Sequence, residues 1–149
     1  MRTILRRRME GKTDYGARMN LLKSKAPRLV VRITNRYIIA QIIKSREAQD
    51  NVVCTANSKE LVKYGMAETF SMKNVNHGYL TGILIGKKAK EKKISEAILD
   101  IGLKKSTKGS KIYAVVKGCA DSGISIKYSE ELVPKISEDT TRIKEKILK

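Results

Sequence analysis

The sequence predicts an α/β protein in which helices cover a mixed β-sheet, preceded by a basic N-terminal arm. Two β-rich segments separated by turn residues come early, and segments with helical periodicity alternate with a short apolar strand later. With 149 residues and 41% hydrophobic side chains, the chain can bury one core. We expect an arm at residues 1–27, a domain at residues 28–134 and a charged C-terminal helix within residues 135–149.

The arm ends at Pro27 and contains one expected short helix. Asp14 can cap the N-terminus of this helix by accepting a backbone hydrogen bond. Tyr15, Met19 and Leu22 follow at the spacing of one helical face, so they predict a small apolar anchor beside basic residues. We expect the arm to become ordered on a partner.

Residues 28–33 and 37–43 predict a β-hairpin. Both segments are rich in β-branched residues, and Asn35 lies between them, where Asn tolerates the left-handed conformation of a tight turn. Three arginines are expected on the rim of this hairpin: Arg28, Arg32 and Arg36.

The later elements follow from the period of the apolar residues. They are a strand at 51–56, a short helix that begins at Ser58, a loop at 65–76, a helix at 77–92, a strand at 98–101, a helix at 110–122 and a helix from about 137 to 149. Gly78, Gly82 and Gly86 recur every four positions, so they share one helical face, which we expect to pack closely on the sheet.

The net charge of +17 predicts a polyanionic partner. The excess forms two blocks, because residues 1–50 carry 13 basic and 4 acidic side chains and residues 87–117 carry 10 and 3. Nine of the ten arginines lie in the first 46 residues, whereas the second block contains only lysine. Since guanidinium groups bind phosphates with a planar fork and stack on bases, we expect the recognition surface in the N-terminal third. The lysine block is either a supporting phosphate contact or a solvated face.

Membrane, metal and secreted-protein classes are disfavoured. The apolar runs are too short to span a bilayer, and no apolar stretch follows the N-terminal arginines, so we expect a cytoplasmic protein. Cys54 and Cys119 lie far apart in apolar segments, which supports neither a disulfide framework nor a zinc site and predicts two reduced core thiols. We expect no cofactor and no small-molecule substrate.

The sequence shows no set of residues that is typical of a catalytic site. The segment 82–88 resembles a phosphate-binding loop but has too few residues between its glycines and no Ser or Thr after the lysine. Asp14, Asp100 and Asp121 are expected in capping and turn roles rather than at a two-metal centre. His77 is the only histidine and has no partner for a catalytic triad.

The arm and the hairpin offer binding chemistry instead. Their basic side chains can donate to phosphates: Arg6, Arg7, Arg8, Lys12, Arg18, Lys23, Arg28, Arg32 and Arg36. Tyr15 or Tyr37 can stack on an unpaired base, although a tyrosine within a strand is more often part of the core. At residues 107–111, Ser110 would cap a helix whose free N–H groups face an anion; an ordinary helix start is the alternative.

Several segments carry a family resemblance. The run Arg-Arg-Arg-Met-Glu-Gly-Lys-Thr-Asp-Tyr-Gly-Ala-Arg occupies residues 6–18, and Pro-Arg-Leu-Val-Val-Arg at 27–32 precedes Thr-Asn-Arg at 34–36. Tyr-Leu-Thr-Gly at 79–82, Gly-Lys-Lys-Ala at 86–89, Ala-Ile-Leu-Asp-Ile-Gly-Leu at 97–103 and Gly-Ser-Lys at 109–111 follow in order. Over roughly residues 6 to 134, these segments resemble the archaeal branch of the large-subunit ribosomal protein that binds 5S rRNA, L-eighteen in the bacterial naming.

The resemblance implies a ribonuclease-H-like topology without its catalysis, docked on 5S rRNA beside 23S rRNA and the ribosomal protein L-five. It implies RNA contacts from the arm, the hairpin and the helix start: Arg6, Arg7, Arg8, Lys12, Thr13, Tyr15, Arg18, Arg28, Arg32, Asn35, Arg36, Lys108, Ser110 and Lys111. Between residues 65 and 78 the chain departs from the family pattern of a Trp and a Gly-rich loop ending in Asn-Thr-Pro. Met66 and the run Asn-Val-Asn-His at 74–77 stand there, so no family contact is carried over onto this loop.

The sequence therefore predicts a structural constituent of the large ribosomal subunit that binds 5S rRNA and helps attach it to 23S rRNA. A general DNA-binding or chromatin-type protein is the alternative that the charge alone favours. An RNA-processing enzyme on the same fold is a third reading.

Overall fold

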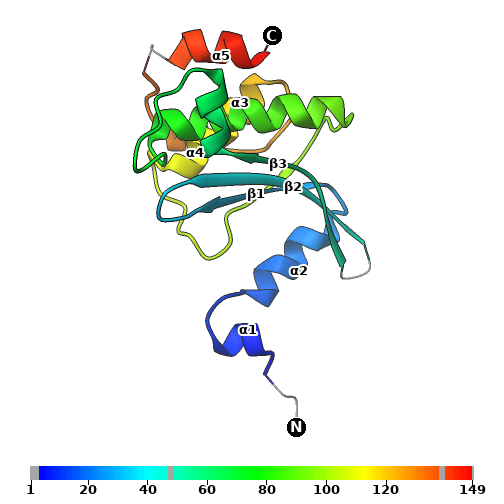
Figure 1. Cartoon of the computed structure of the whole chain (residues 1–149). Helices are drawn as coiled ribbons and strands as arrows, with labels where there is room; N and C mark the ends of the chain where they lie inside the picture. The colour runs from blue at the N-terminus through cyan, green and yellow to red at the C-terminus, as the bar shows by residue number, and fades with distance from the viewer. Residues whose placement is uncertain (1–3, 47–48, 138–139, 149) are drawn as a thin grey trace.

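A four-stranded sheet in the order β3-β2-β1-β4 forms the centre of the computed structural model (Figure 1). The structure describes residues 4–46, 49–137 and 140–148, so the first three residues of the predicted arm and residues 138, 139 and 149 of the predicted C-terminal helix lie outside it. The elements in chain order are α1 (Arg6–Met9), α2 (Tyr15–Lys23), β1 (Arg28–Ile33), β2 (Ile38–Arg46), β3 (Gln49–Asn57), η1 (Ser58–Tyr64), α3 (Val75–Glu91), β4 (Ile98–Asp100), α4 (Lys111–Asp121), η2 (Glu130–Leu132) and α5 (Thr140–Leu148). The predicted α/β class is confirmed, and the ribonuclease-H-like topology stays a prediction.

The predicted hairpin is confirmed, with a different turn chemistry. β1 and β3 both pair antiparallel with β2, and β4 runs parallel to β1, which makes the sheet mixed. Among the non-glycine residues described, only Lys25 and Lys93 have positive φ, so Asn35 does not adopt the expected left-handed conformation. Thr34 closes the turn instead, because its backbone N–H donates to the Tyr37 carbonyl at 2.9 Å and its hydroxyl accepts from the Tyr37 N–H at 3.0 Å.

The core lies between one face of the sheet and the helices. Alternate residues of β1 and β2 point to this face and are fully buried or nearly so: Leu29, Val31, Ile38, Ala40 and Ile42. Leu80, Ile83 and Leu84 of α3 and the apolar face of α4 pack against them. The helices α3, α4 and α5 therefore cover one side of the sheet, and the arm projects on the other side (Figure 1).

The glycine face of α3 packs on α4, not on the sheet as predicted. A Cβ at Gly82 would overlap the Val115 carbonyl oxygen of α4, and a Cβ at Gly118 would overlap the Tyr79 carbonyl oxygen of α3. The two helix backbones thus approach so closely that only glycine fits at both positions. The period-four pattern correctly indicated a close approach, but the pattern has no information on which neighbour makes it.

The C-terminal helix α5 lies over α3. Ile147 is fully buried there, and the Lys87 ammonium group donates to the Ile147 carbonyl oxygen at 2.6 Å. Lys144 donates to the Tyr79 hydroxyl at 3.2 Å. Lys87, which the sequence assigned to a cluster facing phosphate or solvent, therefore holds the end of the chain.

The arm contains two short helices, α1 and α2, where one was expected. The Asp14 cap is confirmed, since its carboxylate accepts from the Ala17 N–H at 3.1 Å. Of the predicted apolar anchor, Met19 is 63% exposed, whereas Tyr15 and Leu22 are half-buried.

Smaller differences occur at the ends of the other elements. η1 begins at Ser58 as predicted and is capped by Asn57 through a reciprocal capping box with Glu60, while the Ser58 hydroxyl accepts from the Ile38 N–H. α3 begins at Val75, two residues earlier than predicted, while β4 and α4 lie within their predicted ranges. Within the described residues, no helix is long and apolar enough to cross a membrane.

Candidate nucleic-acid interface

The structure divides the predicted contact residues among three places. The arm carries Arg6, Arg7, Arg8, Lys12, Thr13, Tyr15, Arg18 and Lys23. The helix-free face of the sheet carries Arg28 and Arg32. The β1–β2 turn and the start of α4 carry Asn35, Arg36, Lys108, Ser110 and Lys111.

The arm presents its basic side chains to solvent. Glu10 pairs with Arg6 at 2.8 Å and with Lys12 at 2.7 Å, and these two hydrogen bonds, with Lys12 the stronger, lower the pKa of Glu10. Arg7 donates to the Thr13 hydroxyl at 2.8 Å. Within the described chain, no carboxylate lies within 4 Å of Arg7 or Arg8. Glu10 thus pairs with two of these four cations, and the arm keeps an excess of positive charge.

Arg28 is buried rather than on the rim of the hairpin, which corrects the prediction. Its side chain is 4% exposed and donates to Asp100 at 2.7 Å, to Asp50 at 2.8 Å and to the Ser45 hydroxyl at 3.0 Å. These acceptors come from β4, β3 and β2, so one guanidinium group bonds three strands. The Arg28 N–H groups that donate to these acceptors are therefore not available to a phosphate.

Asp50 and Asp100 extend this contact into a network. Asp50 also accepts from Arg18 at 2.8 Å, which fastens α2 of the arm to β3. Asp100 accepts from Arg32 at 3.0 Å. Two carboxylates therefore join three of the predicted RNA-contacting arginines to one another.

The charges around Asp50 determine its protonation. Burial, the largest influence, raises the pKa of Asp50, but the hydrogen bond from Ser45 and the charges of Arg28 and Arg18 outweigh it, so that the pKa is lowered. Asp50 is therefore ionised over a wide range of pH and keeps both guanidinium groups in place.

Asp100 has a role that the sequence did not predict in full. Its carboxylate accepts from the Gly102 N–H at 2.9 Å, which is the expected turn role, but its main partners are Arg28 and Arg32. Asp121 likewise does more than end a helix, because it accepts from the Tyr79 hydroxyl at 2.8 Å and pairs with Lys117 at 3.1 Å.

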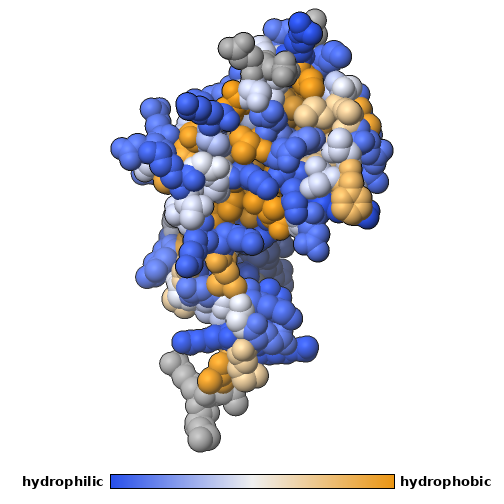
Figure 2. Space-filling view, turned by 90° about the vertical axis from the view of Figure 1, so that its left-hand side faces the viewer, coloured by the Kyte–Doolittle hydropathy of each residue, from blue (hydrophilic) through white to orange (hydrophobic). Residues whose placement is uncertain are grey.

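At the end of the sheet that carries the β1–β2 turn, a hollow of about 370 Å³ is lined by cations. Ser110 caps α4 as predicted, accepting from the Ile112 N–H at 3.2 Å, and lies in this hollow with Lys111. Lys73, Lys104 and Lys105 also line it, and no carboxylate of the described residues lies within 4 Å of these lysines. Figure 2 looks onto this end of the molecule, where hydrophilic side chains cover most of the surface.

These three lysines are not among the predicted contact residues. Lys104 and Lys105 form a basic pair a few residues before the predicted helix start, so the sequence alone could have indicated them as contacts. Lys73 has no such signal, because it belongs to the divergent loop, and only folding brings that loop beside the start of α4. Lys108 is exposed next to the hollow but does not line it.

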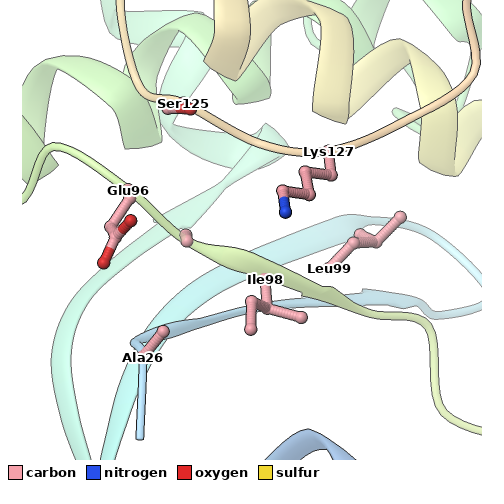
Figure 3. Close-up of a pocket in the computed structure, with 7 residues that line it drawn as sticks. Ala26, Glu96, Ile98, Leu99, Ser125 and Lys127 are labelled. Atoms are coloured by element: carbon pink, nitrogen blue, oxygen red, sulfur yellow. The ribbon is translucent and has the colours of Figure 1, made fainter. Parts of the chain in front are cut away.

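A second hollow, of about 270 Å³, lies at the outer edge of β4 (Figure 3). Ile98 and Leu99 of the strand line it, and Lys127 reaches into it from the loop after α4. None of the predicted contact residues borders this hollow, so it is not part of the candidate interface.

The described residues form no cluster of metal ligands. No three His, Cys, Asp or Glu side chains are close enough there to hold a metal ion. The three aspartates considered for metal chemistry lie apart and are bonded to protein groups: Asp14, Asp100 and Asp121. Cys119 is buried and Cys54 half-buried, both as free thiols, and burial raises the pKa of each.

A model of the family described as ribosomal large subunit proteins 60S L5, and 50S L18 matches residues 1–94 and 87–129. The chain belongs to this family. The resemblance predicted from the sequence is thereby confirmed, and the family consists of ribosomal proteins rather than enzymes.

Individual relatives agree with this assignment. The large ribosomal subunit protein uL18 of Korarchaeum cryptofilum is 52% identical over 92% of this chain and 68% of its own length. The uL18 proteins of Aeropyrum pernix and Methanoregula boonei are each 46% identical, over 89% and 90% of this chain and 62% and 75% of their own lengths. The chain therefore spans about two thirds of the length of these relatives.

Proposed function

We propose that this chain is a structural constituent of the large ribosomal subunit that binds 5S rRNA and helps attach it to 23S rRNA, beside the ribosomal protein L-five. It acts in the cytoplasm and without catalysis. The observation that carries this proposal is the family membership together with a row of exposed arm cations that have few carboxylate partners. We further propose the division into an arm at 1–27, a domain at 28–134 and a C-terminal helix at 135–149.

The exposed and half-buried members of the predicted set, apart from Arg18, make the RNA contacts. They are Arg6, Arg7, Arg8, Lys12, Thr13, Tyr15, Lys23, Arg32, Asn35, Arg36, Lys108, Ser110 and Lys111. Arg28 and Arg18 act differently: Arg28 is buried against Asp50 and Asp100, and Arg18 bonds Asp50, whereas Arg32 bonds Asp100 but stays 44% exposed. We assign Arg28 to holding the strands that carry the surface, and Arg18 to fixing α2 against β3.

The salt dependence of 5S rRNA affinity tests the proposal. If about 6 to 10 phosphates are neutralised, affinity falls on the order of a thousandfold or more between about 50 and 200 mM salt. An affinity that does not change with salt would contradict the proposed phosphate contacts.

The location of the site is tested by two variants with the same charge change. Replacing Arg6, Arg7 and Arg8 by Ala removes three positive charges from the arm, and replacing Lys90, Lys92 and Lys93 removes three exposed charges at the end of α3. We expect a large loss of 5S rRNA affinity from the arm variant and a small one from the control. Equal losses would mean that net charge alone, and not the arm, determines binding.

Competition distinguishes the alternative function. A general nucleic-acid binder releases labelled 5S rRNA equally well to duplex DNA and to unlabelled 5S rRNA, since phosphates dominate such binding. We expect unlabelled 5S rRNA to compete far better than duplex DNA at the same phosphate concentration. RNA that stays intact with protein and Mg²⁺ is expected as well, because the proposed function includes no cleavage.

A further inference from the structure

Phe70 is an aromatic side chain that neither the predicted contacts nor the fold uses. It is the only phenylalanine of the chain and is 80% exposed, the most exposed of the large apolar side chains described. The Arg36 guanidinium group lies over its ring, 4.5 Å from the centroid. A single exposed apolar residue is ordinary on a protein surface, but one stacked by a guanidinium group beside a cationic hollow requires an explanation.

The ring is held in a defined place. Two residues later, Met72 is fully buried, and its N–H donates to the Arg36 carbonyl oxygen at 2.8 Å. Met72 also forms a bridge with Tyr37, so the loop runs beside the β1–β2 turn. Because the Thr34 hydrogen bonds close that turn, both Phe70 and Arg36 stand on fixed backbone.

The surroundings of the ring favour nucleic acid. The same loop places Lys73 in the hollow that Lys104, Lys105 and Lys111 line. Loop 65–74 itself is neutral, since it carries Glu68 and Lys73, so the positive charge near the ring comes from Arg36 and from the lysines of the hollow. An aromatic face bordered by cations is the arrangement that binds an unpaired base by stacking and its neighbouring phosphates by charge.

We infer that Phe70 and Arg36 form a stacking platform for an unpaired RNA base, and that the lysines of the neighbouring hollow bind the flanking phosphates. This inference rests on the proposed function, because it requires that the chain binds RNA. It adds a base-contacting residue on the loop where the chain departs from its family pattern. Phe70 thus contacts a base, whereas the arm and the lysines contact phosphates. Stacking on the base is insensitive to salt, and the phosphate contacts weaken as the salt concentration rises.

Phe70→Leu tests the stacking, because leucine keeps an apolar side chain and removes the aromatic face. We expect 5S rRNA affinity to fall roughly 5- to 150-fold, the range that the stacking of one base contributes. Phe70→Trp should bind at least as tightly as wild type. The slope of log affinity against log salt should stay unchanged in Phe70→Leu and become shallower in Lys104→Ala.

Fluorescence gives an independent readout of the same contact. The chain has no tryptophan, so Phe70→Trp carries a single reporter at the platform, and Leu148→Trp carries one on an exposed position of α5 as a matched control. Stacking on a base should quench the fluorescence of Trp at position 70 when 5S rRNA is added, and leave the α5 reporter unchanged.

The outcomes are distinguishable. Affinity of Phe70→Leu within twofold of wild type overturns the platform, and so does the absence of quenching at position 70 under conditions where binding is measured separately. In both cases the proposed function stands, because RNA still binds. If wild-type protein fails to bind 5S rRNA, the proposed function fails and the platform fails with it. Since the ring is exposed, unfolding by urea should be the same for Phe70→Leu and wild type, which excludes misfolding as the cause of a loss.

Discussion

Replacing Arg28 by Met tests whether this residue holds the sheet together. Methionine keeps an unbranched apolar stem of similar reach and removes the charge and all donors. The substitution deletes three hydrogen bonds, to Asp100 at 2.7 Å, to Asp50 at 2.8 Å and to Ser45 at 3.0 Å. Because the Arg28 side chain is 4% exposed, water cannot replace these bonds without opening the structure.

The magnitude follows from what remains after the substitution. Removing one partner of a buried ion pair costs about 3 to 5 kcal/mol, since the other charge stays buried without compensation. Here Asp100 retains Arg32 and Asp50 retains Arg18, so each carboxylate keeps one cation. The Nε atom of Arg28 is also buried without a partner in the described structure, and its desolvation cost disappears. We therefore expect a loss near the lower limit, about 3 kcal/mol.

Arg18→Met is the matched control. It removes an ion pair with the same Asp50, but the Arg18 and Asp50 side chains are 37% and 30% exposed. Exposed ion pairs contribute about 0 to 1 kcal/mol, so the control should change the free energy of unfolding by less than 1 kcal/mol.

Urea denaturation followed by circular dichroism measures both free energies of unfolding. Equal losses below 1 kcal/mol for the two variants would refute the reasoning, because burial would then have no effect on the value of the Arg28 contacts. A double variant with Asp100→Asn should lose less than the two single variants added together, since Arg28 and Asp100 form one interaction.

Acid provides a second test of the network. The pKa of Asp50 is lowered in the folded protein, so its contribution to stability is complete above its unfolded pKa near 3.8 and is lost as the pH falls through the lower folded value. Without Arg28 the folded pKa of Asp50 should rise, and this part of the acid dependence should become smaller. Urea midpoints of wild type and Arg28→Met between about pH 6 and pH 3 check this expectation.

Three further outcomes follow from buried groups. Gly82→Ala should cost about 3 kcal/mol or more in urea unfolding, because its Cβ overlaps backbone of α4, while Gly16→Ala in the exposed helix α2 should be nearly neutral. Burial lowers the pKa of His77, whose ring nitrogens have no partner in the described structure, so wild type should lose stability as the pH drops below about 6.5 and His77→Phe should lose less. Burial raises the pKa of Cys119 to about 12, so iodoacetamide at pH 8 should alkylate the half-buried Cys54 first, as mass spectrometry would detect.

The local elements were predictable because their causes are local. β-Branched segments on either side of turn residues placed β1 and β2, and the helical period of the apolar residues placed α3 and α4, each with ends within a few residues of the structure. Asp14 and Ser110 were recognised as caps, since a cap depends on the next two or three residues only. The left-handed conformation predicted for Asn35 is wrong, because hydrogen bonds of Thr34 to Tyr37 close the turn without it.

The candidate interface was predictable in outline. The positive charge of residues 1–50 and the family resemblance follow from the sequence, and most arm side chains are exposed as expected. The prediction that Arg28 lies on the rim is wrong, and nothing near Arg28 in the chain distinguishes it from Arg32 or Arg36. Its partner Asp100 is 72 residues away.

The sequence by itself determined the fold class, the family and the amount of charge, because composition, periodicity and residue order are properties of the chain alone. Only the tertiary structure decided which arginines are neutralised within the protein, which helix receives the glycine face of α3, and which side chains surround Phe70. The physical reason is that ion pairing and close packing depend on distance in space. Folding places Asp100 beside Arg28 and loop 65–74 beside the β1–β2 turn, and no local sequence pattern predicts that these segments meet.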